Sequence, residues 1–115
     1  MASTKNINKF KDKFSKKQNT IAHNRQLDNG TIVQVAGIIE EVKVITTRRG
    51  GYMAFVRLAD FSDKIEIVVF SETWNNYKNL LILDQCVVVQ GKISQRQGEI
   101  SLLLEKAKKL ESETN

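Results

Sequence analysis

The chain has 115 residues and a mass of 13.1 kDa, which is enough for one domain with a modest core and too little for two. Hydrophobic residues make up 41% and charged residues 27%, and no apolar run approaches the roughly 18 residues of a membrane-spanning helix. One cysteine and one histidine exclude an internal disulfide and every zinc site built from several thiolates. We therefore expect a cytoplasmic protein without a metal, a cofactor, a membrane contact or a small-molecule substrate.

The net charge of +5 is concentrated at the N-terminus. Residues 1–26 hold seven basic residues and one acidic residue, a local charge of +6. Residues 27–115 hold eleven basic and twelve acidic residues, so their charge is −1. The pI of 9.4 therefore says little about the main part of the chain. A binding surface there must come from a local cluster of charges.

Residues 1–26 are predicted to form a basic leader that is partly helical. Ile7, Phe10 and Phe14 lie at i, i+3 and i+7, on one face of a short helix. This helix either packs against a neighbouring element or serves as a basic contact arm. The following residues, 27–110, are predicted to form the folded domain, and 111–115 a polar tail.

From residue 30 onward the pattern indicates five strands. Val33 and Val35 share one phase of the first strand, whereas Val42 and Val44 share the other. A strand that changes phase must bulge or bend, and Gly37 is the expected place. The predicted strands span residues 31–46, 52–60, 65–70, 86–95 and 99–106.

A helix is predicted between the third and fourth strands. We expect Ser71 to cap it and Leu83 to lie near its end. Trp74 and Tyr77 recur at helical spacing, which favours packing against the core. The order of three strands, a helix and two strands, with a long bent first strand, is typical of the OB-fold, an all-β, five-stranded Greek-key barrel.

Three segments carry a resemblance to a known family: residues 35–39 (VAGII), 49–60 (RGGYMAFVRLAD) and 65–70 (IEIVVF). Together they resemble the OB domain in the C-terminal part of the bacterial DNA polymerase III alpha subunit. The match covers about residues 30–105. The resemblance implies a fragment of a much longer DNA-directed DNA polymerase, a nucleotidyltransferase, that binds the single-stranded template in DNA replication.

The chain by itself is not predicted to be an enzyme. Two-metal phosphoryl transfer needs convergent carboxylates. Glu40 and Glu41 are expected on opposite faces of a strand, and Asp60 and Asp63 flank a turn. Neither pair has the arrangement of a metal clamp, so we expect no catalytic residues.

OB barrels bind single strands across strands two and three, between the loops that join strands one to two and four to five. In the second strand, the phase of Val56 fits the barrel interior, so Phe55 and Arg57 are expected to face outward. A base can stack on the ring while the arginine contacts a phosphate; the alternative is packing of Phe55 under a loop or a partner. Glu66 is expected beside Phe55, where it can accept a hydrogen bond from a cytosine amino group. The predicted nucleic-acid-binding residues are Lys43, Arg48, Arg49, Phe55, Arg57, Glu66, Lys92 and Arg96.

Three functions remain open on this sequence. The first is a module of the replicative polymerase that binds single-stranded DNA. The second is a barrel that docks other replisome proteins, which the near-neutral charge of residues 27–115 favours. The third is an anticodon-binding domain for tRNA, because the corresponding domains of aspartyl-type tRNA synthetases resemble the second strand and have a phenylalanine in the place of Phe55.

Overall fold

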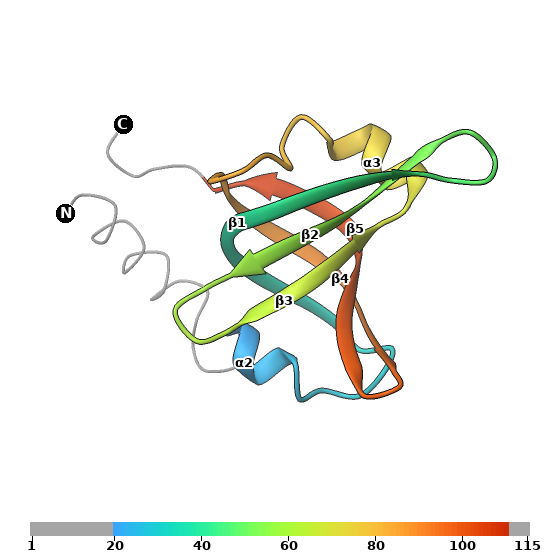
Figure 1. Ribbon diagram of the computed structural model, residues 1–115. Helices are drawn as coiled ribbons and strands as arrows, with labels where there is room; N and C mark the ends of the chain where they lie inside the picture. The colour runs from blue at the N-terminus through green and yellow to red at the C-terminus, as the bar shows by residue number, and fades with distance from the viewer. Residues whose placement is uncertain (1–19, 111–115) are drawn as a thin grey trace, which may run out of the picture.

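The computed structural model describes residues 20–110. The predicted helix face of Ile7, Phe10 and Phe14 and the predicted tail lie outside the described residues. Two short helices and five strands follow in chain order (Figure 1): α2 (Ile21–Asn24), β1 (Ile32–Thr46), β2 (Tyr52–Ala59), β3 (Lys64–Val69), α3 (Ser71–Tyr77), β4 (Cys86–Arg96) and β5 (Glu99–Lys109). None of the helices in this part of the chain is long and apolar enough to cross a membrane.

The five strands close into a barrel in the order β1-β2-β3-β5-β4, which confirms the predicted OB-fold. β3 and β5 run parallel, and the other neighbours run antiparallel. β1 pairs with β4 along its first half and with β2 along its second half, because it bends around the barrel. Figure 1 shows the β1–β2 hairpin extending beyond the barrel on the side of α3.

The phase change in β1 is confirmed, but the bulge is not at Gly37. Val35 and Ile39 are buried, and the register with β2 shifts between Ile39 and Glu41. The extra residue returns Val42 to the inner side, opposite Val56 of β2. Gly37 meets a different need: a β-carbon there would collide with the backbone carbonyl of Ala59. Glycine therefore lets β1 and β2 approach closely where the strand coils.

The helix prediction was wrong at both ends. The N-cap of α3 is Phe70 and not Ser71, and no side chain bonds the free backbone N–H groups. The helix ends at Tyr77 instead of near Leu83, because the chain must turn back towards β1. There the backbone N–H of Asp84 donates to the carbonyl of Ile39 at 2.8 Å. The core role of the aromatic residues is confirmed, since Trp74 and Tyr77 pack against the hydrophobic cluster.

β5 is three residues longer than predicted, because its ladder with β4 continues past a second irregularity. The register shifts between Gln90 and Gly91, and pairing then continues as far as Lys109 opposite Val87. The sequence after residue 104 is rich in lysine, so hydrophobic alternation does not show where this strand ends.

The described part of the leader packs against one end of the barrel. Ile21 is fully buried in the core. Its backbone N–H donates to Asp60 Oδ2 at 2.9 Å, and that of Ala22 donates to Ser62 Oγ at 3.0 Å. Thr20 caps the short helix by accepting from the N–H of His23. Residues 20–26 thus pack against the barrel, whereas the role of the predicted helix of Ile7, Phe10 and Phe14 stays a prediction.

Candidate nucleic-acid interface

The outward side of β2 has the phase predicted from the sequence. Ala54, Val56 and Leu58 are buried inside the barrel. Phe55 is half-buried and Arg57 is exposed, so both lie on the outside. Together with the outward side chains of β3 and of the second half of β1, they form a surface that we call the outer face. The strand pairs arrange its side chains in rows that run across the three strands.

The first row, the charged row, consists of Glu41, Arg57 and Glu66. Arg57 lies opposite Glu41 of β1 and opposite Glu66 of β3. Its Nη1 is 3.2 Å from Glu41 Oε1, and both side chains are about half exposed. An exposed pair of this kind contributes about 0–1 kcal/mol, so it orients Arg57 without neutralising it. Arg57 therefore has an acidic register partner on each neighbouring strand, and its ion pair is with Glu41.

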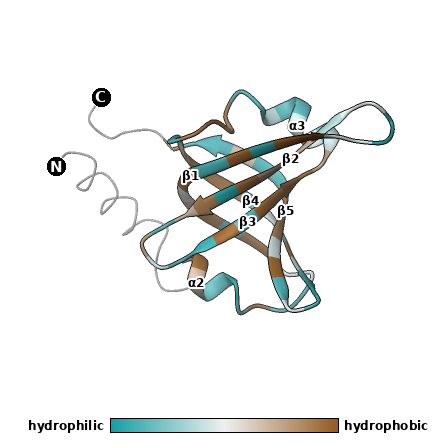
Figure 2. Cartoon of the chain, in the orientation of Figure 1, coloured by the Kyte–Doolittle hydropathy of each residue, from teal (hydrophilic) through white to brown (hydrophobic). Residues whose placement is uncertain are grey.

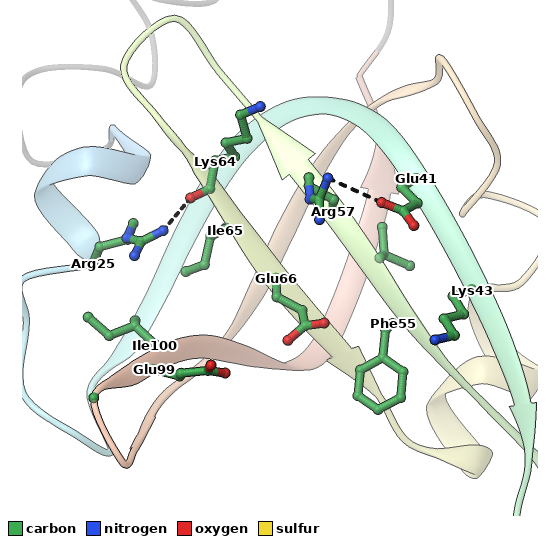
Figure 3. Close-up of a pocket in the computed structure, with 12 residues that line it drawn as sticks. Arg25, Glu41, Lys43, Phe55, Arg57, Lys64, Ile65, Glu66, Glu99 and Ile100 are labelled. Carbon is green, nitrogen blue, oxygen red and sulfur yellow. Dashed lines mark hydrogen bonds and ion pairs between the residues drawn. The ribbon is translucent and has the colours of Figure 1, made fainter.

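The second row, the aromatic row, consists of Lys43, Phe55 and Val68. Phe55 has Lys43 on one side and Val68 on the other. Figure 3 shows the side chains of Lys43 and Glu66 on either side of the Phe55 ring. Glu66 lies opposite Arg57 and diagonally next to Phe55. The row therefore combines an aromatic surface with a nearby ammonium group, which is what a stacked nucleotide requires.

An open groove of about 630 Å³ follows the charged and aromatic rows down to the β4–β5 turn. Its charges are nearly balanced, because four cationic and three acidic side chains line it. The cations come from four separate segments, since the C-cap of α2 and the strands β1, β2 and β3 contribute one each. The charged lining residues are Arg25, Lys43, Arg57, Lys64, Glu41, Glu66 and Glu99.

Half of the predicted binding residues line this groove: Lys43, Phe55, Arg57 and Glu66. Arg96 lines an adjoining hollow of about 270 Å³ that shares Glu66 and Glu99 with the groove. The turn between β4 and β5 therefore flanks the outer face, as predicted.

The other three predicted residues lie elsewhere. Arg48 and Arg49 are at the tip of the β1–β2 hairpin, whose turn is closed by the N–H of Thr47 donating to the carbonyl of Gly51 at 2.8 Å. They do not line the groove, and their turn follows the last register pair of the hairpin, Thr46 with Tyr52. Lys92 is exposed on β4, opposite Ile32 of β1 and Leu103 of β5, and also lies outside the groove.

The sequence reasoning missed Arg25 and Lys64 as groove residues. Arg25 Nη1 donates to the carbonyl oxygen of Lys64 at 2.7 Å, and its Nε is 3.8 Å from Asp63 Oδ2. Lys64 Nζ is 3.8 Å from Glu40 Oε1. Arg25 precedes the barrel in the chain and is separated from Lys64 by 39 residues, so no local pattern connects the two.

Within residues 20–110 no cluster of three or more histidine, cysteine or acidic side chains could hold a metal ion. Burial raises the pKa of the Cys86 thiol on β4. Apart from its ion pairs, the outer face presents the Phe55 ring, the Lys43 ammonium group and the Glu66 carboxylate, and these groups are suited to binding.

Comparison with known proteins identifies the family. Residues 33–110 match the OB-fold nucleic acid binding domain family. The chain belongs to this family. It is also 38% identical over 82 residues to the DNA polymerase III subunit alpha of Borreliella burgdorferi, which confirms the resemblance stated above. That match covers 70% of this chain but 7% of the relative, so the chain spans a small part of the curated proteins it matches.

Two solved structures show the same fold at low sequence identity. A mitochondrial single-stranded DNA binding protein from S. cerevisiae aligns with a TM-score of 0.58 and 16% identity, over 74% of this chain and 98% of that protein. The asparaginyl-tRNA synthetase of Entamoeba histolytica aligns with a TM-score of 0.61 and 15% identity, over 77% of this chain and 23% of that protein.

Proposed function

We propose that this chain binds single-stranded DNA, as the OB module of a replicative DNA polymerase similar to polymerase III alpha. The observation that carries the proposal is the aromatic row, with Phe55 beside Lys43 and one row away from Arg57 on the outside of the barrel. The family and the polymerase relatives support a nucleic acid as the ligand. Because the match covers 7% of such a polymerase, we assign nucleotidyl transfer to other parts of the parent protein.

In this proposal a base stacks on Phe55, which contributes about 1–3 kcal/mol. Lys43 and Arg57 contact the phosphates on either side of that nucleotide. The hairpin-tip arginines, Arg48 and Arg49, and Arg96 at the end of β4 extend the contacts along the DNA strand. Exposed phosphate contacts act through the release of counterions, so the affinity depends on salt.

The acidic groups of the groove limit this attraction. Glu41 and Glu66 both lie beside Arg57, and each opposes an approaching phosphate. Glu66 has a second use, because its carboxylate can accept a hydrogen bond from the amino group of a cytosine stacked on Phe55. We therefore expect a modest affinity, with stacking as the larger contribution inside the groove.

A second candidate function is docking of another replisome protein, with little affinity for DNA. The near balance of four cations and three acids in the groove favours it, because a surface of mixed charge suits a protein partner as well as a nucleic acid. The two functions differ in their salt dependence and in their need for an aromatic ring.

The test is an anisotropy titration of a labelled oligothymidine with the 115-residue chain at several salt concentrations. Three to five phosphate contacts give a log–log slope of about −2 to −3.5 on single strands, or a loss of about 15- to 130-fold between about 50 and 200 mM salt. Arg49→Ala should reduce the slope by about 0.7, the share of one contact. Lys108→Ala, an exposed lysine paired with Val88 of β4, is the matched control and should leave it unchanged. No measurable binding at low salt would favour the docking function instead.

A further inference from the structure

The outer face continues past Phe55 towards the hairpin, and there it becomes apolar. Ile45 of β1 and Met53 of β2 are register partners, one row beyond Lys43 and Phe55. Both are partly exposed. On β3 the same direction leads from Val68, the partner of Phe55, to Phe70 two residues later. We call this third set, Ile45, Met53 and Phe70, the apolar row.

Phe70 belongs to the outer face because the alternation of β3 continues through it. Its backbone is extended, with φ −72° and ψ 165°. Val69 is fully buried inside the barrel, and 50% of Phe70 is exposed to solvent. In an extended strand successive side chains point to opposite faces, so Phe70 points to the same side as Val68. A large apolar ring is thus left in water beside the aromatic row.

The position of Phe70 is held from both directions. It is the N-cap of α3, and its carbonyl accepts the N–H of Trp74 at 2.7 Å. Trp74 in turn packs against the core. On the other side the hairpin lies close, because a β-carbon on Gly51 would be 3.4 Å from Ser71 Oγ. Because the backbone of Phe70 is already held, a ligand that covers the ring does not have to order a loop, which favours binding.

We propose that Phe70 is a second stacking platform and takes the base next to the one that stacks on Phe55. This inference rests on the proposed function and adds a residue that selects single strands. Diagonal neighbours on adjacent strands are about 7–8 Å apart. That is about twice the 3.4 Å that separates successive nucleotides of a stacked strand. Two neighbouring bases can therefore cover both rings when the DNA is stretched and unstacked, which base pairing in a duplex prevents.

DNA that covers both rings also comes closer to the two arginines of the β1–β2 hairpin. The last register pair of the hairpin, Thr46 with Tyr52, lies one residue beyond Ile45 and Met53, and the turn with Arg48 and Arg49 follows. Figure 2 shows a hydrophilic tip on this hairpin, next to more hydrophobic strand segments. A strand that passes from Phe55 to Phe70 thus approaches these two cations, although they do not line the groove.

The experiment compares Phe70→Ala with a matched control on the same labelled oligothymidine, using the 115-residue chain. We expect Phe70→Ala to weaken binding by about 5- to 150-fold, the equivalent of one stacked base. The control is Phe61→Ala, because 59% of Phe61 is exposed and it lies in the turn before β3, at the opposite end of that strand from Phe70. It should bind as the unchanged chain does. Circular dichroism checks that both variants keep the barrel.

Two further measurements separate stacking from simple packing. Phe70→Leu keeps apolar volume and loses the ring, so it should bind as weakly as Phe70→Ala; binding as strong as that of the unchanged chain would overturn the stacking role. The ratio of affinities for single-stranded over duplex DNA should fall in Phe70→Ala by a similar factor. If Phe70→Ala binds normally while Phe55→Ala binds weakly, the second platform is wrong and the proposed function stands. If the unchanged chain binds no oligonucleotide, the proposed function fails first.

Discussion

Replacing Phe55 and its neighbour Val56 in turn separates the ligand-binding and structural roles of β2. The two residues are adjacent in the chain, but Phe55 lies on the outer face and Val56 is 1% exposed inside the barrel. Phe55→Ala removes one stacking surface, so binding of oligothymidine should weaken by about 5- to 150-fold. The stability cost should be small, because a cross-strand pair with Val68 contributes about 0.2–1 kcal/mol.

Val56→Ala should have the opposite effect. It removes two buried carbon groups at about 0.8 kcal/mol each, and the cavity that they leave raises the total to about 2 kcal/mol. For a domain of this size the midpoint of thermal unfolding should fall by about 8–16 °C. Binding measured well below that midpoint should stay close to that of the unchanged chain, because the outer face retains its ring and cations.

The assay pairs an anisotropy titration of labelled oligothymidine with thermal unfolding followed by circular dichroism. Each variant serves as the control for the other, since both shorten a side chain of the same strand to alanine. The reasoning is refuted if Phe55→Ala lowers the unfolding midpoint as much as Val56→Ala and leaves binding unchanged. Phe55 would then pack under a loop or a protein partner, and the docking function would be favoured.

Three other predictions follow from single residues. Glu66→Ala removes both the negative charge and the acceptor, so it should tighten binding of oligothymidine and lower the preference for oligocytidine, both measured by competition titration; an unchanged preference would contradict a role for Glu66 in base recognition. Ile21→Ala should destabilise the barrel by about 2–5 kcal/mol in urea unfolding, since Ile21 is fully buried, and an unchanged midpoint would contradict its place in the core. Cys86 should react with iodoacetamide more slowly in the folded chain at pH 8 than in urea, because burial raises its pKa and lowers the thiolate fraction.

The fold could be predicted because its signals are local. The alternation of Ala54, Val56 and Leu58 marks the inner side of β2, and the phase change of β1 requires a bulge somewhere between Val35 and Val42. The bulge itself could not be placed, since it depends on how β1 pairs with β2. Gly37 was the expected place because it is the one glycine in the strand, but a glycine is needed there because the backbone of Ala59 on the neighbouring strand lies too close for a β-carbon. Such contacts between distant segments leave no pattern in the sequence.

The candidate site was predictable along each strand and only approximately between strands, since Glu66 was expected beside Phe55 and lies diagonally next to it, opposite Arg57. Phe55 and Arg57 follow from the alternation of β2 alone. Which residues lie beside Arg57 depends on how the strands pair. Glu41 lies opposite it because the bulge shifts the register of β1 between Ile39 and Glu41. From the sequence, Arg25 counts as one of the basic residues of the leader. In the structure it caps α2 and lies in the groove, where it donates a hydrogen bond to the carbonyl of Lys64.

The two kinds of binding energy lie on different parts of this molecule. Inside the groove the charges nearly cancel, so in the proposed function we expect Phe55 to supply most of the affinity there, and Phe70 to add to it from the neighbouring apolar row. Arg48 and Arg49 of the hairpin tip lie outside the groove, away from its acids. Removing a ring should therefore lower the affinity by the same factor at every salt concentration, whereas removing an arginine should change the salt slope. If Phe55→Ala or Phe70→Ala changed the salt slope, the DNA would no longer make the same phosphate contacts, and the proposed path across the rows would be wrong.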